Sequence, residues 1–433
     1  MRETIRGLGA LWGVYLRALG KWVGVALAAG ALCGAIGSAF HLGVAYATAL
    51  RAAHGWLLFL LPLVGLAVVA VYKALGTEGQ STNDILEEIH SGHGVSIRLL
   101  PAIFLATLLT HLGGGSAGRE GAALQMGGAI GYQTGRLLRL DDSDLRITTT
   151  IGMAAFFSAL FGTPVAATVF AMGITSVGRV YYAGLLPCLV ASLTAYGVSA
   201  AFGIAPTAFA VTAPALAPVM LLRVAALSVL CAFVSVLFCE VIHFAEAGAK
   251  RLLPDPWLRA AAGGAVIAGA ALLLGTTDYN GAGMDVVARA VEQGSAAPAA
   301  FALKLLFTAV TLSTGFKGGE VVPSFFVGAT FGCAAGPILG IPAGFAAAIG
   351  LTAVFCGAVN CPLASTILAL ELFGAEGLSY FALACALSFV LSGYSGIYSS
   401  QLILYDKLKA RYINAQTNAH REGEESAAGG NHT

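Results

Sequence analysis

The feature that most constrains the fold is a series of long stretches without charged residues. Stretches free of Asp, Glu, Lys and Arg cover residues 22–50, 52–72, 147–178, 180–222, 224–239, 260–277, 321–370 and 377–405. A helix needs about 20 apolar residues to cross a bilayer, so several stretches are long enough for one or two crossings. Only 10% of the residues are charged, whereas soluble domains carry about 25%. The sequence therefore predicts an all-α, multi-pass integral membrane protein surrounded by the lipid bilayer.

Basic residues lie at both ends of this apolar region. Those before it are Arg2, Arg6, Arg17 and Lys21, and those after it are Lys407, Lys409 and Arg411. Because Lys and Arg are enriched in cytoplasmic segments beside membrane helices, both termini are predicted to be cytoplasmic. That arrangement requires an even number of crossings of the cell (inner) membrane. The net charge of +1 gives no indication of a nucleic-acid partner.

The cysteines indicate packing, and neither a metal site nor a cofactor is predicted. The eight are Cys33, Cys188, Cys231, Cys239, Cys333, Cys356, Cys361 and Cys385. None forms a C-x-x-C pair, and most lie in apolar runs. We interpret them as small core hydrophobes.

Two blocks of sequence occur twice, in the same order. Residues 151–174 and 349–372 share eight of 24 positions without a gap, including Pro164 with Pro362. Residues 110–131 and 311–332 share a glycine pattern, in which Gly114, Gly118, Gly127 and Gly131 match Gly315, Gly319, Gly328 and Gly332. Gly and Pro within apolar runs are typical of broken or re-entrant helices. A two-fold repeat with broken helices predicts a transporter or channel whose site lies between the repeats.

Each glycine-rich block opens onto an apolar helical run. A helix N-terminus leaves backbone N–H groups unpaired and carries a partial positive charge. Two such ends that face each other near the membrane midplane would hold an anion.

Glu120 lies at the first of these predicted helix starts. A carboxylate inside a membrane costs about 2.5–3.5 kcal/mol on insertion scales. Such a carboxylate is retained if it occupies an anion site or takes up a proton. In both cases it competes with a permeant anion, so the movement of that anion is coupled to H⁺. The alternative is an ion pair with Arg119 that only fixes a turn. Because adjacent side chains on a helix diverge, a direct pair is not the expected geometry.

Four segments resemble motifs of the CLC family of anion channels and anion/proton antiporters. "GSAGREGAALQMG" resembles its gating-glutamate motif, and "FGTPVAATVFAM" is similar to its N-A-P-L-A-G segment. "GGEVVPSFFVGA" stands at its G-G-x-F-x-P position, and "GYSGIYSSQ" at its anion-coordinating tyrosine. The resemblance implies a homodimer in which each subunit has its own pore, built from two inverted helical repeats.

The resemblance also implies roles for individual residues. Glu120 would be the gating glutamate and proton acceptor, and Tyr398 would supply a hydroxyl to the anion. Helix-start contacts to the anion would come from Gly118, Arg119, Gly121, Glu320 and Val321. The family's serine segment corresponds to "GTEGQSTND" (76–84), where Gln80 or Ser81 replaces the serine and Asn83 replaces a proline.

The departures from the family pattern resemble its bacterial fluoride/proton antiporter branch. That branch lacks the serine segment, has a residue other than proline after G-R-E-G, and carries a glutamate where this chain has Glu320. Fluoride is a stronger hydrogen-bond acceptor than chloride, and a protonated carboxyl is a strong donor. Gly173 and Ile174 stand where chloride/proton exchangers carry an inner glutamate, and Val322 stands where this branch is expected to have a polar residue.

We therefore predict a CLC-type antiporter that exports fluoride in exchange for H⁺. The alternative is a chloride channel or chloride/proton exchanger of the same family. A serine hydrolase is disfavoured, although "GYSG" and "GGSAG" fit serine motifs. Both motifs need a histidine base, and Ser395 is followed only by His420 and His432 in the polar tail. We predict no enzyme activity.

The expected organisation has four parts: a cytoplasmic segment (1–20), two membrane repeats (21–210 and 211–405) and a disordered cytoplasmic tail (406–433). Four other residues have two readings each. Lys304 and Lys317 are interpreted as snorkelling or loop cations, and the alternative for Lys317 is that it raises the local anion concentration. Glu371 fits a structural bond or a transport role equally, and His111 fits a helix-end histidine better than a proton relay.

Overall fold

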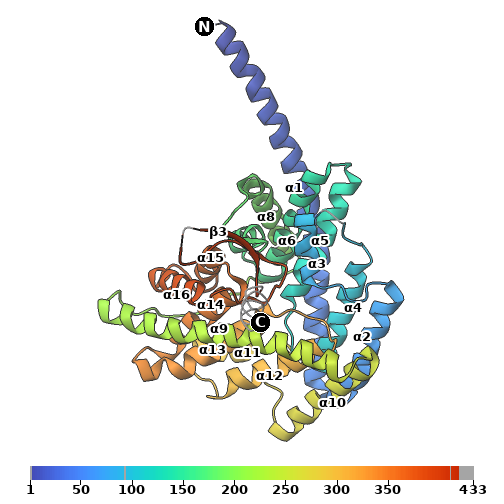
Figure 1. Cartoon of the computed structure of the whole chain (residues 1–433), viewed down its shortest axis with the longest axis vertical. Helices are drawn as coiled ribbons and strands as arrows, with labels where there is room; N and C mark the ends of the chain where they lie inside the picture. The colour runs from blue at the N-terminus through green and yellow to red at the C-terminus, as the bar shows by residue number, and fades with distance from the viewer. Residues whose placement is uncertain (1, 92–93, 410, 419–433) are drawn as a thin grey trace, which may run out of the picture.

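The computed structural model describes residues 2–91, 94–409 and 411–418, with side chains from residue 12 onward. The described chain is mainly helical (Figure 1). The α-helices are α1 (Arg2–Ala53), α2 (Leu61–Leu75), α3 (Thr82–Ser91), α4 (Leu99–Gly113), α5 (Glu120–Leu137), α6 (Asp142–Phe161), α7 (Pro164–Gly173), α8 (Leu185–Ala201), α9 (Pro218–Leu252), α10 (Pro256–Leu274), α11 (Met284–Glu292), α12 (Ala300–Ser313), α13 (Val321–Ala335), α14 (Ala343–Val359), α15 (Pro362–Phe373) and α16 (Leu378–Leu391). The strands are β1 (Ser176–Val177), β2 (Leu402–Tyr405) and β3 (Tyr412–Gln416).

The repeat seen in the sequence is also a repeat in packing. Helix α5 packs on α6 in the first half, and α13 packs on α14 in the second. Small residues allow both contacts: a Cβ on Gly127 would lie 2.8 Å from the Cβ of Phe156, and one on Gly328 would lie 2.7 Å from the carbonyl carbon of Gly350. Glycines at equivalent positions therefore let the same pair of helices approach closely in each half.

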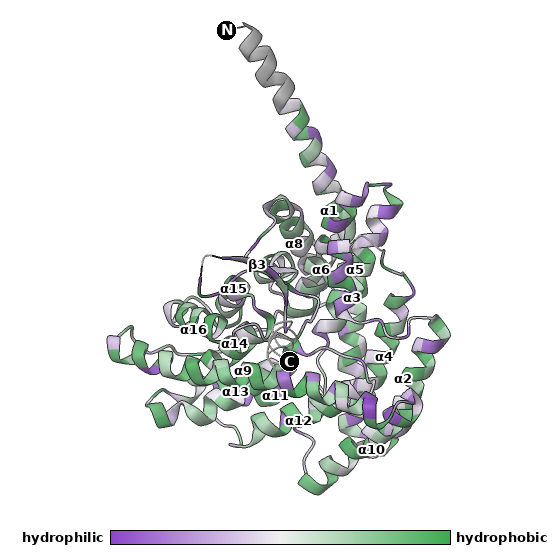
Figure 2. Cartoon of the chain, viewed as in Figure 1, coloured by the Kyte–Doolittle hydropathy of each residue, from purple (hydrophilic) through white to green (hydrophobic). Residues whose placement is uncertain are grey.

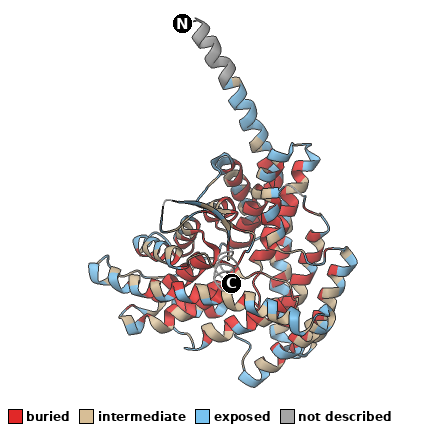
Figure 3. Ribbon diagram, viewed as in Figure 1, coloured by how far each residue is buried: buried red, intermediate tan, exposed pale blue. Residues whose placement is uncertain are grey.

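Helix lengths agree with a membrane protein that contains broken helices. Among the described residues, five helical segments are long and apolar enough to cross a bilayer, the longest being Trp12–Ala53. Other apolar helices have only 10–17 residues, including α7 and α15, which each begin at a proline. Figure 2 shows apolar residues on the outward surfaces of α9 and α10, and Figure 3 shows buried residues concentrated on the central helices. The all-helical prediction is confirmed.

The end of the described chain differs from the sequence expectation. Strand β2 pairs parallel with β1 and antiparallel with β3, so residues 412–416 form a strand where a disordered tail was expected. Lys407 adds to this anchoring, since its ammonium donates to Asn360 at 2.5 Å and to the carbonyl of Phe389 at 2.9 Å. The expected boundary at residue 20 falls inside α1, which continues without a break. Residues 419–433 lie outside the described residues.

Candidate functional site

The two glycine-rich segments meet and pair with each other. The N–H of Gly118 donates to the carbonyl of Gly319 at 2.7 Å, and the N–H of Gly319 donates to the carbonyl of Gly118 at 2.8 Å. Helix α5 starts two residues after Gly118, and α13 starts two residues after Gly319. A Cβ on Gly121 would lie 2.9 Å from the Cα of Gly319. The bridge therefore holds two helix N-termini, with their unpaired N–H groups, against each other.

Glu120 lies at this junction, folded back over the start of its own helix. Its side chain is 1% exposed. Its Oε2 accepts from the backbone N–H of Arg119 at 2.8 Å, and a Cβ on Gly118 would lie 2.5 Å from the same oxygen. Only glycine at position 118 leaves room for the carboxylate. The carboxylate thus occupies an anion position at a helix start.

Arg119 and Glu120 also form an ion pair, which corrects the sequence expectation. Arg119 Nε lies 3.5 Å from Glu120 Oε1. The expectation assumed that both residues lie on one helix, but Arg119 is the N-cap residue, with φ −116° and ψ −6°. Because the Glu120 side chain turns back toward the chain that precedes it, the two side chains converge.

Glu320 lies on the other side of the bridge. It is the N-cap residue of α13, and its Oε2 is buried without a hydrogen-bond partner among the described residues. A Cβ on Gly121 would lie 3.2 Å from this oxygen. Val322 instead covers the Glu120 side, since its Cβ would lie 3.1 Å from a Cβ on Gly118. Each helix start therefore borders the glutamate of the opposite repeat.

The hydroxyl of Tyr398 is a second buried polar group at this site. The residue is 2% exposed, and its hydroxyl has no hydrogen-bond partner in the described part of the chain. Glu320 and Glu120 are both among the charged groups that act on it electrostatically. The structure thus brings the two glutamates together at the bridge and buries Tyr398 within range of their charges, and Val321 is fully buried next to Glu320.

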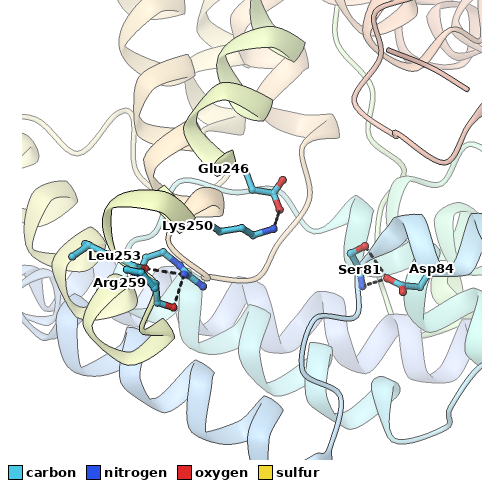
Figure 4. Close-up of polar contacts among 7 residues, drawn as sticks. Ser81, Asp84, Glu246, Lys250, Leu253 and Arg259 are labelled. Carbon is cyan, nitrogen blue, oxygen red and sulfur yellow. Dashed lines mark hydrogen bonds and ion pairs between the residues drawn. The ribbon is translucent and has the colours of Figure 1, made fainter. Parts of the chain in front are cut away.

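The three candidates from the serine-like segment differ in their contacts. Ser81 donates from its N–H and its hydroxyl to Asp84, at 2.6 and 2.9 Å (Figure 4). Asn83 is bonded to Ser400, two residues beyond Tyr398, through its carbonyl and its side chain. Gln80 has a buried Oε1 without a partner among the described residues. The Ser81 hydroxyl is therefore committed to a local bond, whereas Gln80 keeps an unsatisfied polar atom.

A cavity of about 560 Å³ leads to Glu120 from one side. We call it the vestibule; its charged and polar lining includes Arg51, His111, Arg119, Glu120, Asp278, Asn280 and Asp285. Val322 and Phe161 contribute apolar lining. Sequence reasoning missed Arg51 and Asn280. The sequence did offer a signal for Arg51, because it is the single charged residue between the uncharged stretches 22–50 and 52–72.

Lys304 is not a snorkelling cation. It is 0% exposed, and its ammonium donates to the carbonyls of Tyr279 and Gly281 at 3.2 and 2.6 Å. It also lies 5.2 Å from the ring centroid of Phe326. Lys304 therefore fixes the loop that forms one wall of the vestibule. Lys317 is half-buried in the loop before α13, with its ammonium 4.4 Å from the ring centroid of Tyr72.

Glu371 and the cysteines have structural contacts. The Glu371 carboxylate accepts from the N–H groups of Val165 and Ala166 at 3.0 and 2.8 Å, and thereby caps the first turn of α7. The contacts favour the structural reading over the transport role. All eight cysteines are free and buried, which confirms their interpretation as core residues.

Comparison with known proteins identifies the family. Residues 61–393 match the family model described as "Voltage gated chloride channel". The "Chloride/fluoride channel protein" of Pseudomonas syringae pv. tomato is 38% identical over 400 residues, which cover 90% of this chain and 88% of that protein. The "H(+)/Cl(-) exchange transporter ClcA" of Vibrio cholerae is 26% identical over 64% of this chain and 62% of that protein.

Solved structures agree with this assignment. A crystal structure described as "a CLC-type fluoride/proton antiporter" has a TM-score of 0.86 and 30% identity, covering 88% of this chain and 98% of that one. A "slow cyanobacterial Cl-/H+ antiporter" shares the fold, with a TM-score of 0.74 at 18% identity, covering 95% and 99% of the two chains. The family match, the 38% identical relative and the shared fold together show that this chain belongs to the CLC family of chloride channels and anion/proton antiporters.

Proposed function

We propose that this chain exports fluoride in exchange for protons. One observation carries the proposal: the Glu120 carboxylate lies on a pair of opposed helix starts, beside a carboxylate oxygen of Glu320 and a hydroxyl of Tyr398 that are buried without partners among the described residues. Buried polar atoms are normally hydrogen-bonded. A small anion held by donors would complete this site.

The donor set suits fluoride. Tyr398 supplies an O–H, the helix starts supply backbone N–H groups, and protonated Glu320 supplies a second O–H. Fluoride accepts hydrogen bonds more strongly than chloride and costs more to dehydrate, so it needs such donors. Deprotonation of Glu320 replaces a donor with a negative charge, which repels the anion. Binding and release of fluoride are thereby tied to a proton.

Glu120 acts as the gate and external proton acceptor. Its carboxylate and a permeant anion compete for the same positive helix start. A proton on Glu120 removes that competition and lets the anion pass toward the vestibule. In this proposal Gly118, Arg119, Gly121 and Val321 shape the anion site around the two glutamates. Gln80 and Asn83 flank the route by which the anion reaches this site from the inner side, whereas the Ser81 hydroxyl is hydrogen-bonded to Asp84.

The relatives support this choice, since the names of two of them mention fluoride. The second candidate is a chloride channel or chloride/proton exchanger. It is favoured by Gly173 and Ile174, which supply no inner carboxylate at the end of α7, and by the apolar Val322. The Vibrio cholerae exchanger shows that chloride transport occurs within the family.

The protein functions as a homodimer in the inner membrane in this proposal. Exposed apolar side chains on α7, α8 and α15, such as Val165, Leu193 and Leu363, offer a surface for a second copy or for lipid. Both termini face the cytoplasm, as the basic residues at the two ends suggest.

Flux from proteoliposomes tests the proposal. Vesicles are loaded with fluoride or chloride, and anion efflux and pH are recorded together. Wild-type protein is expected to release fluoride with proton uptake and to transport chloride much more slowly. Glu120→Gln, which cannot take up a proton, is expected to lose H⁺ coupling. Unchanged coupling in this variant would remove Glu120 from the mechanism, and chloride flux equal to fluoride flux would favour the second candidate.

A further inference from the structure

The direction of the Tyr398 side chain is not set by a helix or a strand. Tyr398 begins the turn at residues 398–401, which we call the Tyr398 turn and which lies between α16 and β2. The residue is 2% exposed, and the charges of Glu120 and Glu320 act on its hydroxyl. That hydroxyl has no hydrogen-bond partner among the described residues. The backbone of the turn must therefore hold the hydroxyl in place.

Backbone hydrogen bonds attach this part of the chain at two points. The N–H of Ile397 donates to the carbonyl of Ala358, in the last turn of α14, at 3.0 Å. The N–H of Gln401 donates to the carbonyl of Tyr398 at 3.1 Å and closes the turn. The start of the turn is thus attached to a helix, whereas its end depends on what holds Gln401.

The side chain of Gln401 attaches the end of the turn to two helices. It is fully buried, and its amide nitrogen donates to the carbonyls of Ile174 and Val359, both at 2.9 Å. Its amide oxygen accepts from Nδ2 of Asn360 at 3.1 Å. Ile174 is the C-cap residue of α7, and Val359 is the last residue of α14. One amide therefore joins the ends of two helices from different halves of the chain to the Tyr398 turn.

The backbone of the turn is also held from two sides. The carbonyl of Gln401 accepts from the N–H and the hydroxyl of Thr417, each at 2.9 Å. Thr417 is 3% exposed and directly follows β3. Ser400 donates from its N–H to the side-chain oxygen of Asn83 at 3.2 Å, and from its hydroxyl to the Asn83 carbonyl at 3.0 Å. Gln401 is the member of the turn that connects it to both helices and to the terminal strand.

We propose that Gln401 is a positioning residue for the Tyr398 hydroxyl; the inference rests on the proposed function. Both N–H donors of its amide are committed to carbonyls, so it has none to offer the anion. It acts through Tyr398: it fixes the turn against α7 and α14, and the hydroxyl keeps one direction while anions bind and leave. A donor that is already aimed at its ligand loses less conformational freedom on binding. Gln401 thereby raises the affinity for fluoride.

The test measures the fluoride KM of proton-coupled efflux from proteoliposomes. Tyr398→Phe removes the hydroxyl and is expected to raise this KM by about tenfold to 100-fold. Gln401→Met has a similar length but no donor, and it is expected to raise the KM by at least about fivefold. The KM does not depend on how much of the reconstituted protein is folded, so a loss of stability alone leaves it unchanged.

A double variant separates positioning from a purely structural role. If Gln401 acts through the hydroxyl, its loss has no further effect once the hydroxyl is absent. Gln401→Met combined with Tyr398→Phe is therefore expected to have the KM of Tyr398→Phe alone. The matched control is Gln133→Met, because the Gln133 amide also donates to a backbone carbonyl, that of Val95 at 2.7 Å, but near the end of α5. This control is expected to keep the wild-type KM.

Either of two results overturns the inference: a wild-type KM in Gln401→Met, or a double variant whose KM is raised by the product of the two single factors. If Gln401→Met does not fold, Thr417→Val decides, since it removes one hydrogen bond to the Gln401 carbonyl. It is expected to raise the KM by about twofold to tenfold, and a wild-type KM in this variant overturns the inference. Failure of the proposed function looks different, because wild-type protein would then show no proton-coupled fluoride flux at all.

Discussion

Gly121→Ala tests whether the close approach of the two helix starts creates the anion site. A Cβ at this position would lie 2.9 Å from the Cα of Gly319 and 3.2 Å from Glu320 Oε2, whereas an ordinary Cβ contact needs 3.4 Å or more. The helix starts must therefore separate by about 0.5 Å, which lengthens the two bridge hydrogen bonds from 2.7 and 2.8 Å to about 3.2 and 3.3 Å. Overpacking of this kind costs about 1–3 kcal/mol.

The consequence for transport follows from that cost. If the strain falls on the anion-bound state, fluoride flux drops by about 5-fold to 150-fold. Chloride is larger and tolerates a wider gap, so its flux is expected to fall less, and the fluoride-to-chloride ratio decreases. The assay is initial efflux of each anion from proteoliposomes, read with fluoride and chloride electrodes.

Gly197→Ala is the matched control, because it is also a helical glycine but a Cβ there meets nothing within 4 Å. It is expected to transport both anions at wild-type rates. The reasoning is refuted if Gly121→Ala retains the wild-type fluoride rate and selectivity. It is equally refuted if both fluxes fall by one factor, since that result indicates a general folding defect rather than a wider site.

Three further outcomes are expected. Glu320→Ala removes a donor to the anion and lowers fluoride flux by about tenfold to 100-fold, whereas Glu320→Gln keeps a donor but loses proton coupling; both are read in the same efflux assay. Lys304→Met leaves two loop carbonyls unpaired and lowers stability by about 1–3 kcal/mol, measured by thermal unfolding in detergent. The Ser143 hydroxyl and the Asp144 N–H hold the pKa of Asp141 below its ordinary value. The Asp141 carboxylate, as the N-cap of α6, therefore stabilises this helix fully above about pH 4. That stabilisation is lost as the pH falls through the lowered pKa of Asp141 in the folded protein. The protection factors of the amides in the first turn of α6, which are corrected for the intrinsic pH dependence of hydrogen exchange, should therefore fall in acid, and Asp141→Asn should remove that dependence.

The sequence was sufficient to predict the features of the site that depend on the backbone. Glycine segments that precede apolar runs indicated two helix starts, and the repeated spacing indicated that they are equivalent. Both follow from local rules: helix ends leave N–H groups unpaired, and only glycine permits the contact between Gly118 and Gly319. The family assignment followed from the same segments.

The sequence was insufficient where tertiary contacts decide the role of a side chain. Lys304 looked like a snorkelling cation because its carbonyl partners lie more than 20 residues away in the loop at 279–281. The Arg119–Glu120 pair was unexpected because the sequence indicated a helix start but not that the Glu120 side chain folds back toward the N-cap residue Arg119. His111 was read as a satisfied helix-end histidine, and only the fold reveals that its Nε2 is buried without a hydrogen-bond partner among the described residues.

The paired helix starts have equivalent backbones but different charges. The bridge between Gly118 and Gly319 makes Arg119 equivalent to Glu320, and Glu120 equivalent to Val321. Their surroundings also differ: Arg119 and Glu120 line the vestibule, whereas Glu320 has Lys317 and Glu246 as electrostatic neighbours. Lys317 lies in the loop before α13, and Glu246 is paired with the exposed Lys250 at 2.7 Å (Figure 4). A symmetric pair of acids would compete for one anion from both sides at once. In the proposed exchange, placing the second acid one residue closer to the bridge would instead give each side of the barrier its own proton site, with the anion between them.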